Sequence, residues 1–519
     1  MKTRLKSLFI DISTLRFAVI ISILNAVLFH IPFIKFCISQ TNIGTFKGLF
    51  ILTSFFFVLF ALNVIITLLL CLISRRLAKI LWCIFFIINA ISLYFINTFG
   101  VILDEPMIGN VLNTNTTEAY SFISTSLVAY TVLLGILPAI YISQVKMPER
   151  HYKKTFSHIG ILSGSILIVV ILNIINFSWI TTNIYIIKSS VMPWAYTVNI
   201  ARYYKHLYQN NKPEVKLPDA KIKDNNKAVV VLVIGESARR ENFSIYGYSR
   251  NTNPLLSAIP NLHHFNAQSD ATFTIAGVKA ILDYKPAAKK KYECLTSYLH
   301  RTGAYVIWRT TNNGQPKMTT DKYLDADSLA KIPSPFRKNY DEVLLSGLKE
   351  EIMAATKNKV LIVLHTGTCH GPIYSMHYPK EFEIYKPVNK SADLEKCNRQ
   401  DIINAYDNTI VYTDYILNNV IKILKEIPGV HSTMMYVSDH GESLGESGFF
   451  MHGVDRLVAP KQQYEIPFII WTSDNYRTIK NLGELSQHYV FHSTLNFLSI
   501  ESPISVSYTH LTLPTICSV

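Results

Sequence analysis

Uncharged hydrophobic runs divide this chain of 519 residues into two halves. Five stretches lack Lys, Arg, Asp and Glu for about the 20 residues that a helix needs to cross a bilayer core. They lie at 17–34, 48–74, 80–103, 122–143 and 158–178. Helices buried in one large soluble core are the alternative, but five such runs in one half of a chain are rare outside membranes. The pattern therefore predicts a five-helix transmembrane domain over residues 1–180.

From Ala228 onward, short apolar and β-branched runs alternate with polar segments that have helical spacing. The runs lie at 228–234, 305–308, 360–364, 434–437 and 467–471. Strands that alternate with helices are typical of a parallel sheet covered by helices on both faces. We therefore predict an α/β domain over residues 228–505, after a multi-pass α-helical membrane domain.

Residues 181–227 connect the two predicted domains. Residues 180–206 are rich in apolar and aromatic side chains and end with Arg202 and Lys205, which is typical of an interfacial helix. The segment from 209 to 227 is polar, contains two prolines and predicts a linker. Residues 506–519, VSYTHLTLPTICSV, resemble a translated sequencing adaptor, so we treat them as a non-native tail and leave them out of the fold.

Charge is distributed unevenly along the chain. The first 200 residues hold 14 basic and 5 acidic residues, whereas the rest hold 36 and 31. Eleven of the basic residues lie before the first span or in the second and fourth loops, so these segments are predicted to be cytoplasmic. They are Lys2, Arg4, Lys6, Arg16, Arg75, Arg76, Lys79, Lys146, Arg150, Lys153 and Lys154. With a cytoplasmic N-terminus and five spans, the chain after about residue 180 is predicted to be exported.

Composition narrows the class of protein further. The formal net charge is +14 and 49% of the residues are hydrophobic, which argues against a disordered chain. The basic excess is concentrated in the apolar half, as expected for contact with membrane lipids, whereas a nucleic-acid binder would carry it on a polar domain. We therefore expect no nucleic-acid partner.

Three of the predicted strands end in residues that suit metal or phosphate chemistry. They lie in the segments VVVLVIGES, LIVLHTGTCHGP and MMYVSDHGESLGE, with one more histidine in FFMHG. The residues are Glu236, His365, His370, Asp439, His440 and His452. A single strand-end glutamate is more often a helix cap or a solvated residue. Carboxylates and imidazoles at three strand ends, where α/β sheets carry their chemistry, together predict a zinc site.

The segments IGESARRENFSIYGYSRNTNP, HGP and SDHGESLGE stand in this order behind the five spans. This arrangement closely resembles the phosphoethanolamine transferases of Gram-negative envelopes, which include the lipid A enzymes that confer polymyxin resistance. The resemblance covers most of residues 1–500 and implies a sulfatase-like domain of the alkaline phosphatase superfamily. It implies transfer of phosphoethanolamine from phosphatidylethanolamine to an envelope glycolipid such as lipid A, through a phosphothreonine. We expect a monomeric inner-membrane enzyme with a periplasmic catalytic domain.

The resemblance also implies a zinc site with a nucleophilic threonine. The implied ligands are Glu236, Thr274, Asp439 and His440. The family pattern Cys-Gly-Thr-x-Thr corresponds here to SDATFT, whose second threonine is Thr274. Thr272 is the alternative nucleophile, because Asp270 replaces the cysteine that would fix the register. Zn²⁺ would lower the pKa of the threonine hydroxyl. One zinc ion is expected, and the pattern leaves room for a second.

Further residues are implied to bind substrate. WRTTNNGQPK matches a segment whose asparagine and lysine contact the substrate phosphate, here Asn313 and Lys317. His370 and His452 match histidines that bind phosphate or a second zinc ion. His365 has no counterpart and is interpreted as a packing residue at the end of a strand.

The outward loop after the third span contains MIGNVLNTNTTEA. It places Asn110, Thr114 and Glu118 four residues apart, so they would share one face if the segment is helical. They match family positions thought to hold the lipid headgroup, where Glu118 could attract the ethanolamine ammonium group. A solvated helical face is the alternative.

Other functions and one structural departure remain open. A glycerophosphate transferase similar to lipoteichoic acid synthase, another sulfatase-superfamily phosphodiesterase and a non-catalytic scaffold are the alternatives. Family members often carry a disulfide that brackets the nucleophile loop, and that pair is absent here. Three cysteines lie in the exported domain, which leaves at least one unpaired, and a bridge from Cys369 to Cys397 is one pairing that they allow. We therefore expect packing to hold the nucleophile loop.

Overall fold

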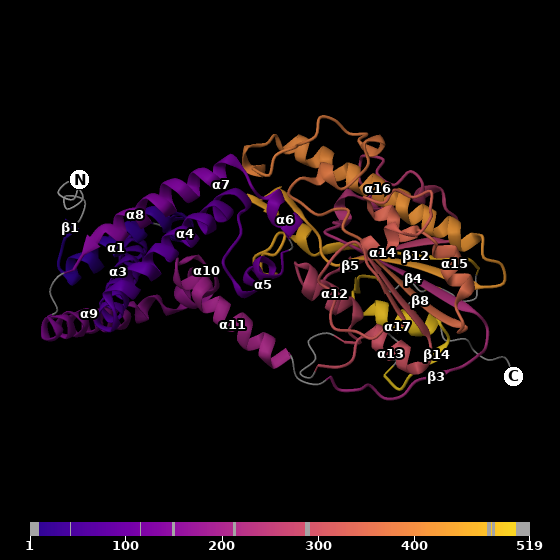
Figure 1. Ribbon diagram of the computed structural model, residues 1–519, viewed down its shortest axis with the longest axis horizontal. Coiled ribbons are helices and arrows are strands. Elements are labelled where there is room, and N and C mark those ends of the chain that lie inside the picture. Colours follow the sequence, from indigo (N-terminus) through magenta and orange to yellow (C-terminus); the bar gives the residue numbers. More distant parts are fainter. Residues whose placement is uncertain are drawn as a thin grey trace. The chain divides into compact units, whose positions relative to one another are not determined.

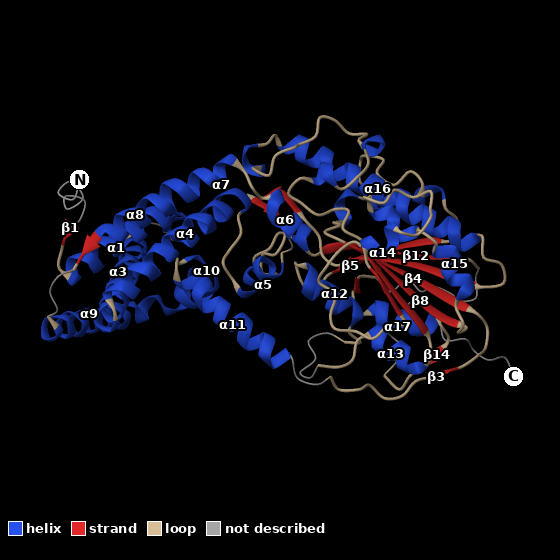
Figure 2. Cartoon of the chain, viewed as in Figure 1, coloured by secondary structure: helices blue, strands red, loops and turns tan. Residues whose placement is uncertain are grey.

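The computed structural model describes residues 10–41, 43–114, 116–147, 151–210, 214–285, 291–474, 479 and 483–504. The predicted non-native tail, residues 506–519, lies outside them. The chain divides into two compact units, Met1–Gly109 with Ile123–Tyr204, and Asn110–Phe122 with Lys205–Val519. Figure 2 shows that the first unit is built mainly of helices and that the long strands belong to the second.

The first unit contains the hydrophobic helices that the sequence predicts. Their bounds are α1 Thr14–Phe29, α2 Ile31–Gln40, α3 Phe46–Ile73, α4 Arg75–Phe99, α7 Thr125–Tyr130, α8 Leu137–Gln144 and α9 Tyr152–Leu172. A π-helical turn joins α7 to α8. Four helical stretches in the described residues are long and apolar enough to span a membrane. The pair α1–α2, bent by 64°, makes a fifth when it counts as one span.

The single interfacial helix expected over 180–206 is instead two helices, α10 (Phe177–Ser190) and α11 (Trp194–Asn210). Their junction is buried inside the first unit, where Met192 and Tyr196 pack against α1 and α4. Polar contacts secure it: the Tyr196 hydroxyl donates to Asn89 at 2.9 Å, and the Asn25 amide donates to the Met192 carbonyl at 2.9 Å. Buried hydrogen bonds thus anchor the junction, whereas apolar side chains elsewhere on the two helices, such as Ile184, Val198 and Tyr208, are exposed.

The second unit is built around an eight-stranded sheet in the order β13-β5-β12-β9-β4-β8-β6-β7. The strand bounds are β4 Ala228–Gly235, β5 Leu262–Gln268, β6 Tyr305–Thr310, β7 Lys322–Leu324, β8 Lys359–His365, β9 His431–Ser438, β12 Glu465–Thr472 and β13 Leu485–Ser486. All five strands predicted from the sequence belong to this sheet. The apolar runs in its centre are buried on both faces, which is the reason that they lack alternation.

Two features of the sheet differ from the prediction. Strand β12 runs antiparallel to β9 and β5, so the sheet is mixed and not parallel throughout. Strand β5 was not predicted, because its sequence LHHFNAQ is polar and half-exposed. A buried apolar run indicates a strand but not its direction, so neither feature could be predicted from hydrophobicity.

Helices cover both faces of the sheet (Figure 1). Their bounds are α12 Thr274–Leu282, α13 Leu295–Thr302, α14 Ala326–Ala330, α15 Leu348–Ala354, α16 Arg399–Lys425 and α17 Tyr489–Phe497. One core joins α12, α13 and α17 to residues such as Leu232 and Trp308 of the sheet. The long α16 packs along the opposite face near β9. The remaining short strands are β1 Ile10–Asp11, β2 Val145–Lys146, β3 Lys221–Ile222, β10 Ser443–Glu446, β11 Phe449–Met451 and β14 Ile500–Glu501.

Candidate active site

The central strands end together and bring the predicted polar residues to one edge of the sheet. Strand β4 is parallel to β9 and β8, and its last residues pair with Ser438 and His365. Glu236 follows β4 directly, and Asp439 follows β9. The parallel register therefore places both carboxylates side by side, as expected at the carboxyl edge of an α/β sheet.

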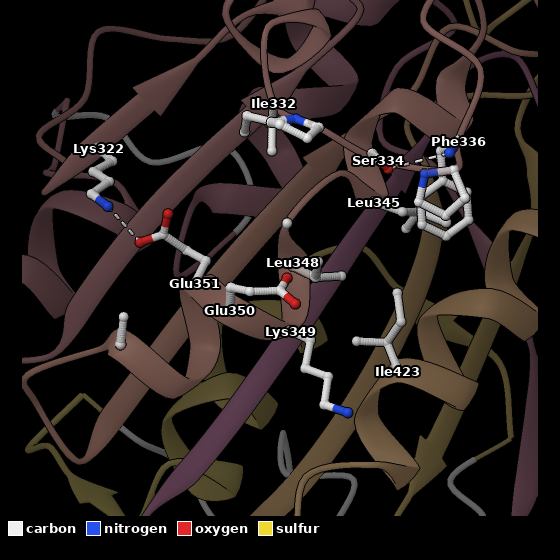
Figure 3. A pocket seen from close by; sticks show the side chains of 14 residues that line it. Lys322, Ile332, Ser334, Phe336, Leu345, Leu348, Lys349, Glu350, Glu351 and Ile423 are labelled. Carbon is white, nitrogen blue, oxygen red and sulfur yellow. Dashed lines mark hydrogen bonds and ion pairs between the residues drawn. The ribbon is translucent and has the colours of Figure 1, made fainter.

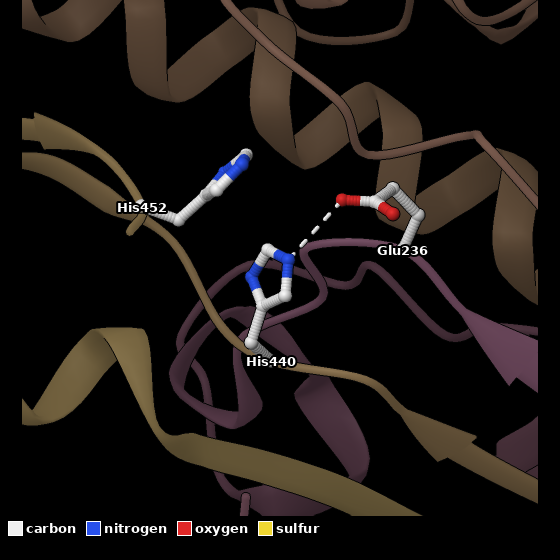
Figure 4. A group of neighbouring side chains, drawn as sticks. All are labelled: Glu236, His440 and His452. Atoms are coloured by element: carbon white, nitrogen blue, oxygen red, sulfur yellow. Dashed lines mark ion pairs between the residues drawn. The ribbon is translucent and has the colours of Figure 1, made fainter. Parts of the chain in front are cut away.

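Four side chains converge in this buried site. The Nε2 atom of His440 lies 3.4 Å from Glu236 Oε1 and 3.5 Å from Asp439 Oδ2. The Oγ1 atom of Thr274 lies 3.2 Å from Glu236 Oε2 and 3.4 Å from His440 Nε2. Figure 4 shows the His440 ring directed at the Glu236 carboxylate, with His452 beside them. The structure thus brings together all four residues that the resemblance implies as zinc ligands.

The donor set fits a tetrahedral metal ion. Ligand atoms about 2.0–2.1 Å from such an ion lie about 3.3–3.4 Å from one another, close to the separations of 3.2–3.5 Å in this site. Asp439 Oδ1 accepts hydrogen bonds from the backbone N–H groups of Ser237 and His440. The other oxygen, Oδ2, is buried and has no hydrogen-bond partner among the described residues. A buried carboxylate oxygen without a donor is costly unless a cation binds it, so the residues fit a metal ion.

Electrostatics in the site supports this assignment. Burial lowers the pKa of His440 to about 3, so its imidazole is neutral near pH 7. Its Nδ1–H donates to the Gly441 carbonyl at 2.9 Å, which leaves the Nε2 lone pair free to face the carboxylates. Burial and the neighbouring Glu236 raise the pKa of Asp439 well above its ordinary range. A divalent cation would relieve this crowding of buried carboxyl groups.

His452 and His370 complete the site. His452 also belongs to a group with Glu236 and His440 whose ligand atoms lie within 4.8 Å of one another. Its Nδ1 lies 2.8 Å from Glu442, and that carboxylate also accepts the Tyr374 hydroxyl at 2.5 Å. The rings of His370 and His452 are 5.4 Å apart. The structure therefore places both predicted histidines beside the four converging residues.

The two candidate nucleophiles have different surroundings. Thr274 is the first residue of α12, and its hydroxyl faces Glu236. The Thr272 side chain is buried, and its hydroxyl donates to the Val454 carbonyl at 2.5 Å. Only Thr274 reaches the carboxylate and imidazole group, because the chain turns away between the two threonines.

A close backbone approach fixes the start of α12. A Cβ atom on Gly277 would lie only 2.2 Å from the Asp439 carbonyl oxygen. Glycine therefore allows the first turn of α12 to lie directly against the segment that carries Asp439 and His440.

Polar contacts, and not packing alone, hold the loop before α12. Asp270, which stands where the resemblance implies a cysteine, forms a hydrogen bond with His488 Nε2 and lies 3.9 Å from Arg456. The Asp270 N–H donates to Gln487 Oε1 at 3.1 Å, and the Gln487 amide donates to the Asp439 carbonyl at 2.6 Å. Gln487 therefore ties this loop to the candidate metal ligands. The expectation that packing alone holds the loop was incomplete.

The cysteines in the described residues form no disulfide bridge. Cys369 and Cys397 are free thiols, so the guessed pair is not formed. Cys369 accepts a hydrogen bond from Thr409 at 3.2 Å, and burial raises its pKa to about 12.

Two of the implied substrate residues do not join the four converging side chains. Asn313 and Lys317 are exposed, and neither side chain is hydrogen-bonded to the four converging residues. A cavity of about 710 Å³ opens beside the site, lined among others by Asn312, Asn313 and His370. A second cavity of about 700 Å³ contains none of the predicted site residues; the Lys322–Glu351 ion pair lies at one side of it (Figure 3).

The predicted headgroup segment forms two helices and not one. Helix α5 spans Glu105–Asn113 and α6 spans Thr116–Ser121, so the condition of a single helix, under which the three residues would share one face, is not met. Asn110 lies in α5, and Thr114 follows it and donates to the Asn110 carbonyl at 2.8 Å. The side chain of Glu118 lies outside the described residues. Thr116 lines the cavity beside the site.

Sequence reasoning missed several residues that shape the site. Asn312 donates to Glu236 Oε2 at 2.7 Å, and no role was predicted for this asparagine from the sequence. Ser237, at a positive φ of 52°, donates to Glu236 Oε1 at 2.6 Å. In the segment that follows Glu236, Asn242 and Arg250 support the fold, because both hydrogen-bond to the buried Asp407. The doubled asparagine in TTNNG was a visible signal, but spacing alone could not show which amide points inward.

Comparison with known proteins agrees with this architecture. Residues 228–500 match the sulfatase family, and residues 50–208 match the family described as phosphoethanolamine transferase EptA/EptB. The two matches together define a sulfatase-like domain joined to a membrane-spanning helical domain, as predicted.

Individual relatives make the assignment specific. Phosphoethanolamine transferase EptA of Helicobacter pylori is 35% identical, over 96% of this chain and 95% of that protein. Phosphatidylethanolamine transferase Mcr-1 of Escherichia coli is 29% identical, over 74% of this chain and 76% of that protein. The structure of the integral membrane protein lipooligosaccharide phosphoethanolamine transferase A of Neisseria meningitidis covers 97% of this chain and 98% of its own, at 25% identity and a TM-score of 0.87. The chain therefore belongs to the phosphoethanolamine transferase family.

Proposed function

We propose that this enzyme transfers phosphoethanolamine from phosphatidylethanolamine to an envelope glycolipid such as lipid A, through a phosphoethanolamine adduct of Thr274. The observation that carries the proposal is the contact of the Thr274 hydroxyl with Glu236 and His440 in a buried set of metal-ligand type. The names of the relatives support the substrates: Mcr-1 is named a phosphatidylethanolamine transferase, and the Neisseria protein is named for lipooligosaccharide.

Zn²⁺ is the proposed metal, held by Glu236, Thr274, Asp439 and His440. When bound, it would lower the pKa of the threonine hydroxyl and balance negative charge on the phosphoryl group. A second ion near His370 and His452 is compatible with the positions of these histidines.

Side chains of the enzyme accept and supply the protons that the reaction requires. The Thr274 hydroxyl already donates to Glu236, so its proton has an acceptor when Oγ1 forms a bond to phosphorus. The bond between phosphorus and the diacylglycerol oxygen breaks, and we assign the proton that this oxygen needs to His370 or His452. In the second half, an acceptor oxygen attacks phosphorus and its proton passes to the histidine that protonated diacylglycerol. The bond between Thr274 Oγ1 and phosphorus breaks, and Glu236 returns its proton to Oγ1.

The proposed location is the inner membrane, with a cytoplasmic N-terminus and a periplasmic catalytic domain. The eleven basic residues on alternate loops support this orientation. Phosphatidylethanolamine in the same membrane would reach the site through the segment that carries Asn110, Thr114 and Glu118, with Asn313 and Lys317 contacting the phosphate. We expect the enzyme to act as a monomer.

The adduct tests the proposal directly. The purified full-length protein is incubated with zinc and phosphatidylethanolamine, and its peptides are analysed by mass spectrometry. We expect a phosphoethanolamine adduct on Thr274, none in Thr274→Ala and a reduced amount in Thr274→Ser, which retains the hydroxyl. Thr272→Ala loses a buried hydrogen bond but should still form the adduct. An adduct on Thr272, with Thr274→Ala still active, would overturn the assignment.

A further inference from the structure

The Glu236 carboxylate is fixed from both sides. Glu236 is 1% exposed, and Oε1 accepts the Ser237 hydroxyl at 2.6 Å. Oε2 accepts the Asn312 amide at 2.7 Å and the Thr274 hydroxyl at 3.2 Å. The bond from Asn312 is the shorter of the two, so Asn312 contributes more than Thr274 to the orientation of Oε2.

The orientation of the Asn312 amide is determined by its other partners. Its Nδ2 also donates to the Thr366 carbonyl at 3.0 Å, and its Oδ1 accepts the backbone N–H of Asn313 at 2.7 Å. A flipped amide would point an oxygen at the Glu236 carboxylate and at a carbonyl, and would lose the bond from Asn313. The amide can therefore act only as a donor to Glu236.

The backbone that carries Asn312 is also held in place. The Thr310 hydroxyl, at the end of β6, accepts the Asn312 N–H at 2.9 Å and donates to the Asn312 carbonyl at 2.6 Å. The same turn is bonded to the end of β8, because the Thr311 N–H donates to the His365 carbonyl at 3.1 Å. Asn312 thus stands on a rigid turn between the ends of β6 and β8.

We propose that Asn312 is a positioning residue, which holds the Glu236 carboxylate in the orientation that binds zinc and receives Thr274. The inference rests on the proposed function of the site. Asn312 contacts neither zinc nor lipid in this role and acts only through Glu236. Ser237 cannot replace it, because its hydroxyl holds the other carboxylate oxygen.

Removal of the amide should therefore affect the metal more than the substrate. In Asn312→Ala, Oε2 keeps only the Thr274 contact, and the carboxylate can rotate away from the ligand arrangement. Loss of a residue that orients a metal ligand typically weakens metal binding by about 10- to 100-fold. The same rotation should slow adduct formation at saturating zinc, while the KM for phosphatidylethanolamine stays near that of the wild type.

Zinc affinity of the full-length protein in detergent is the direct test. The dissociation constant is measured by competition with a fluorescent zinc chelator, and adduct formation is measured at saturating zinc with varied phosphatidylethanolamine. Gln315→Ala is the matched control, because it also removes a side-chain amide from this loop. The Gln315 amide donates to the Tyr323 hydroxyl at 2.8 Å. We expect zinc affinity to fall about 10- to 100-fold in Asn312→Ala and to stay within about 2-fold in Gln315→Ala.

The outcomes separate this inference from the proposed function. Wild-type zinc affinity in Asn312→Ala would overturn it, and so would a raised KM with unchanged zinc affinity, which would make Asn312 a substrate contact. If Asn312→Ala does not fold, Asn312→Ser provides the same test, because serine suits the turn and its hydroxyl is too short to reach Glu236. Failure of the wild-type protein to bind zinc or form the adduct would instead reject the proposed function itself.

Discussion

Substitution of Gly277 by alanine should damage the site without unfolding the domain. The added Cβ would lie 2.2 Å from the Asp439 carbonyl oxygen, whereas unbonded atoms of this kind prefer about 3.5 Å. Helix α12 must therefore move by roughly 1 Å, and Thr274 is only three residues away at its first position. A misplacement of about 1 Å can lower a reaction rate about 100-fold. We expect a loss of that size in the rate of adduct formation.

Gly164→Ala is the control for Gly277→Ala. Gly164 lies in α9, and a Cβ there would meet nothing within 4 Å. Inside a helix, alanine is favoured over glycine by up to about 1 kcal/mol, so the control should keep both activity and thermal stability. The assay follows adduct formation by mass spectrometry and melting by differential scanning fluorimetry. Adduct formation at the wild-type rate in Gly277→Ala would refute the claim that this close approach sets the position of Thr274.

Three further predictions test the metal site, a buried acid and the topology. Asp439→Asn should weaken zinc binding at least about 100-fold, measured by chelator competition, because it removes one of few ligands; near-normal zinc content would reject the site. Burial raises the pKa of Asp414 to about 7. Protonation therefore stabilises the fold below the unfolded pKa near 4, and this contribution is lost as pH rises through 7. Between pH 6 and 8 the wild type should lose about 1.4 kcal/mol more stability than Asp414→Asn, measured by denaturant titration; parallel profiles would contradict this. A periplasmic phosphatase fused after Asn225 should be active and one fused at Lys79 inactive; the reverse result would invert the topology.

Much of the fold could be predicted from the sequence because its signals are local. Uncharged runs mark the membrane helices, and strand runs such as 228–234 coincide with observed strands. The direction of β12 and the existence of β5 could not be predicted, because both depend on pairing between distant segments. The break between α5 and α6 could not be predicted either, because a spacing of four between polar residues does not show where a helix ends.

The site could be predicted in part for the same reason. Glu236, Asp439 and His440 lie next to strand ends, so a sheet with parallel central strands brings them together whatever the loops do. Asn312 and Asn313 differ by one position, and only the turn at Thr310 decides which amide points inward. Spacing identified the segment but gave no role to Asn312, and the predicted phosphate contact of Asn313 stays a prediction.

The loop before α12, which carries the proposed nucleophile, is held by noncovalent contacts where the resemblance implies a disulfide. A disulfide would limit the loop covalently, whereas here Asp270 pairs with His488 and its N–H bonds to Gln487. Gln487 also bonds to the Asp439 carbonyl, so one side chain anchors both the loop of the proposed nucleophile and a proposed metal ligand. A substitution of Gln487 would therefore displace both the loop that carries Thr274 and the backbone of Asp439, whereas loss of a disulfide would affect the loop alone. The position of the proposed nucleophile depends on noncovalent contacts that also shape the proposed metal site, so reducing conditions should leave the activity of the enzyme intact.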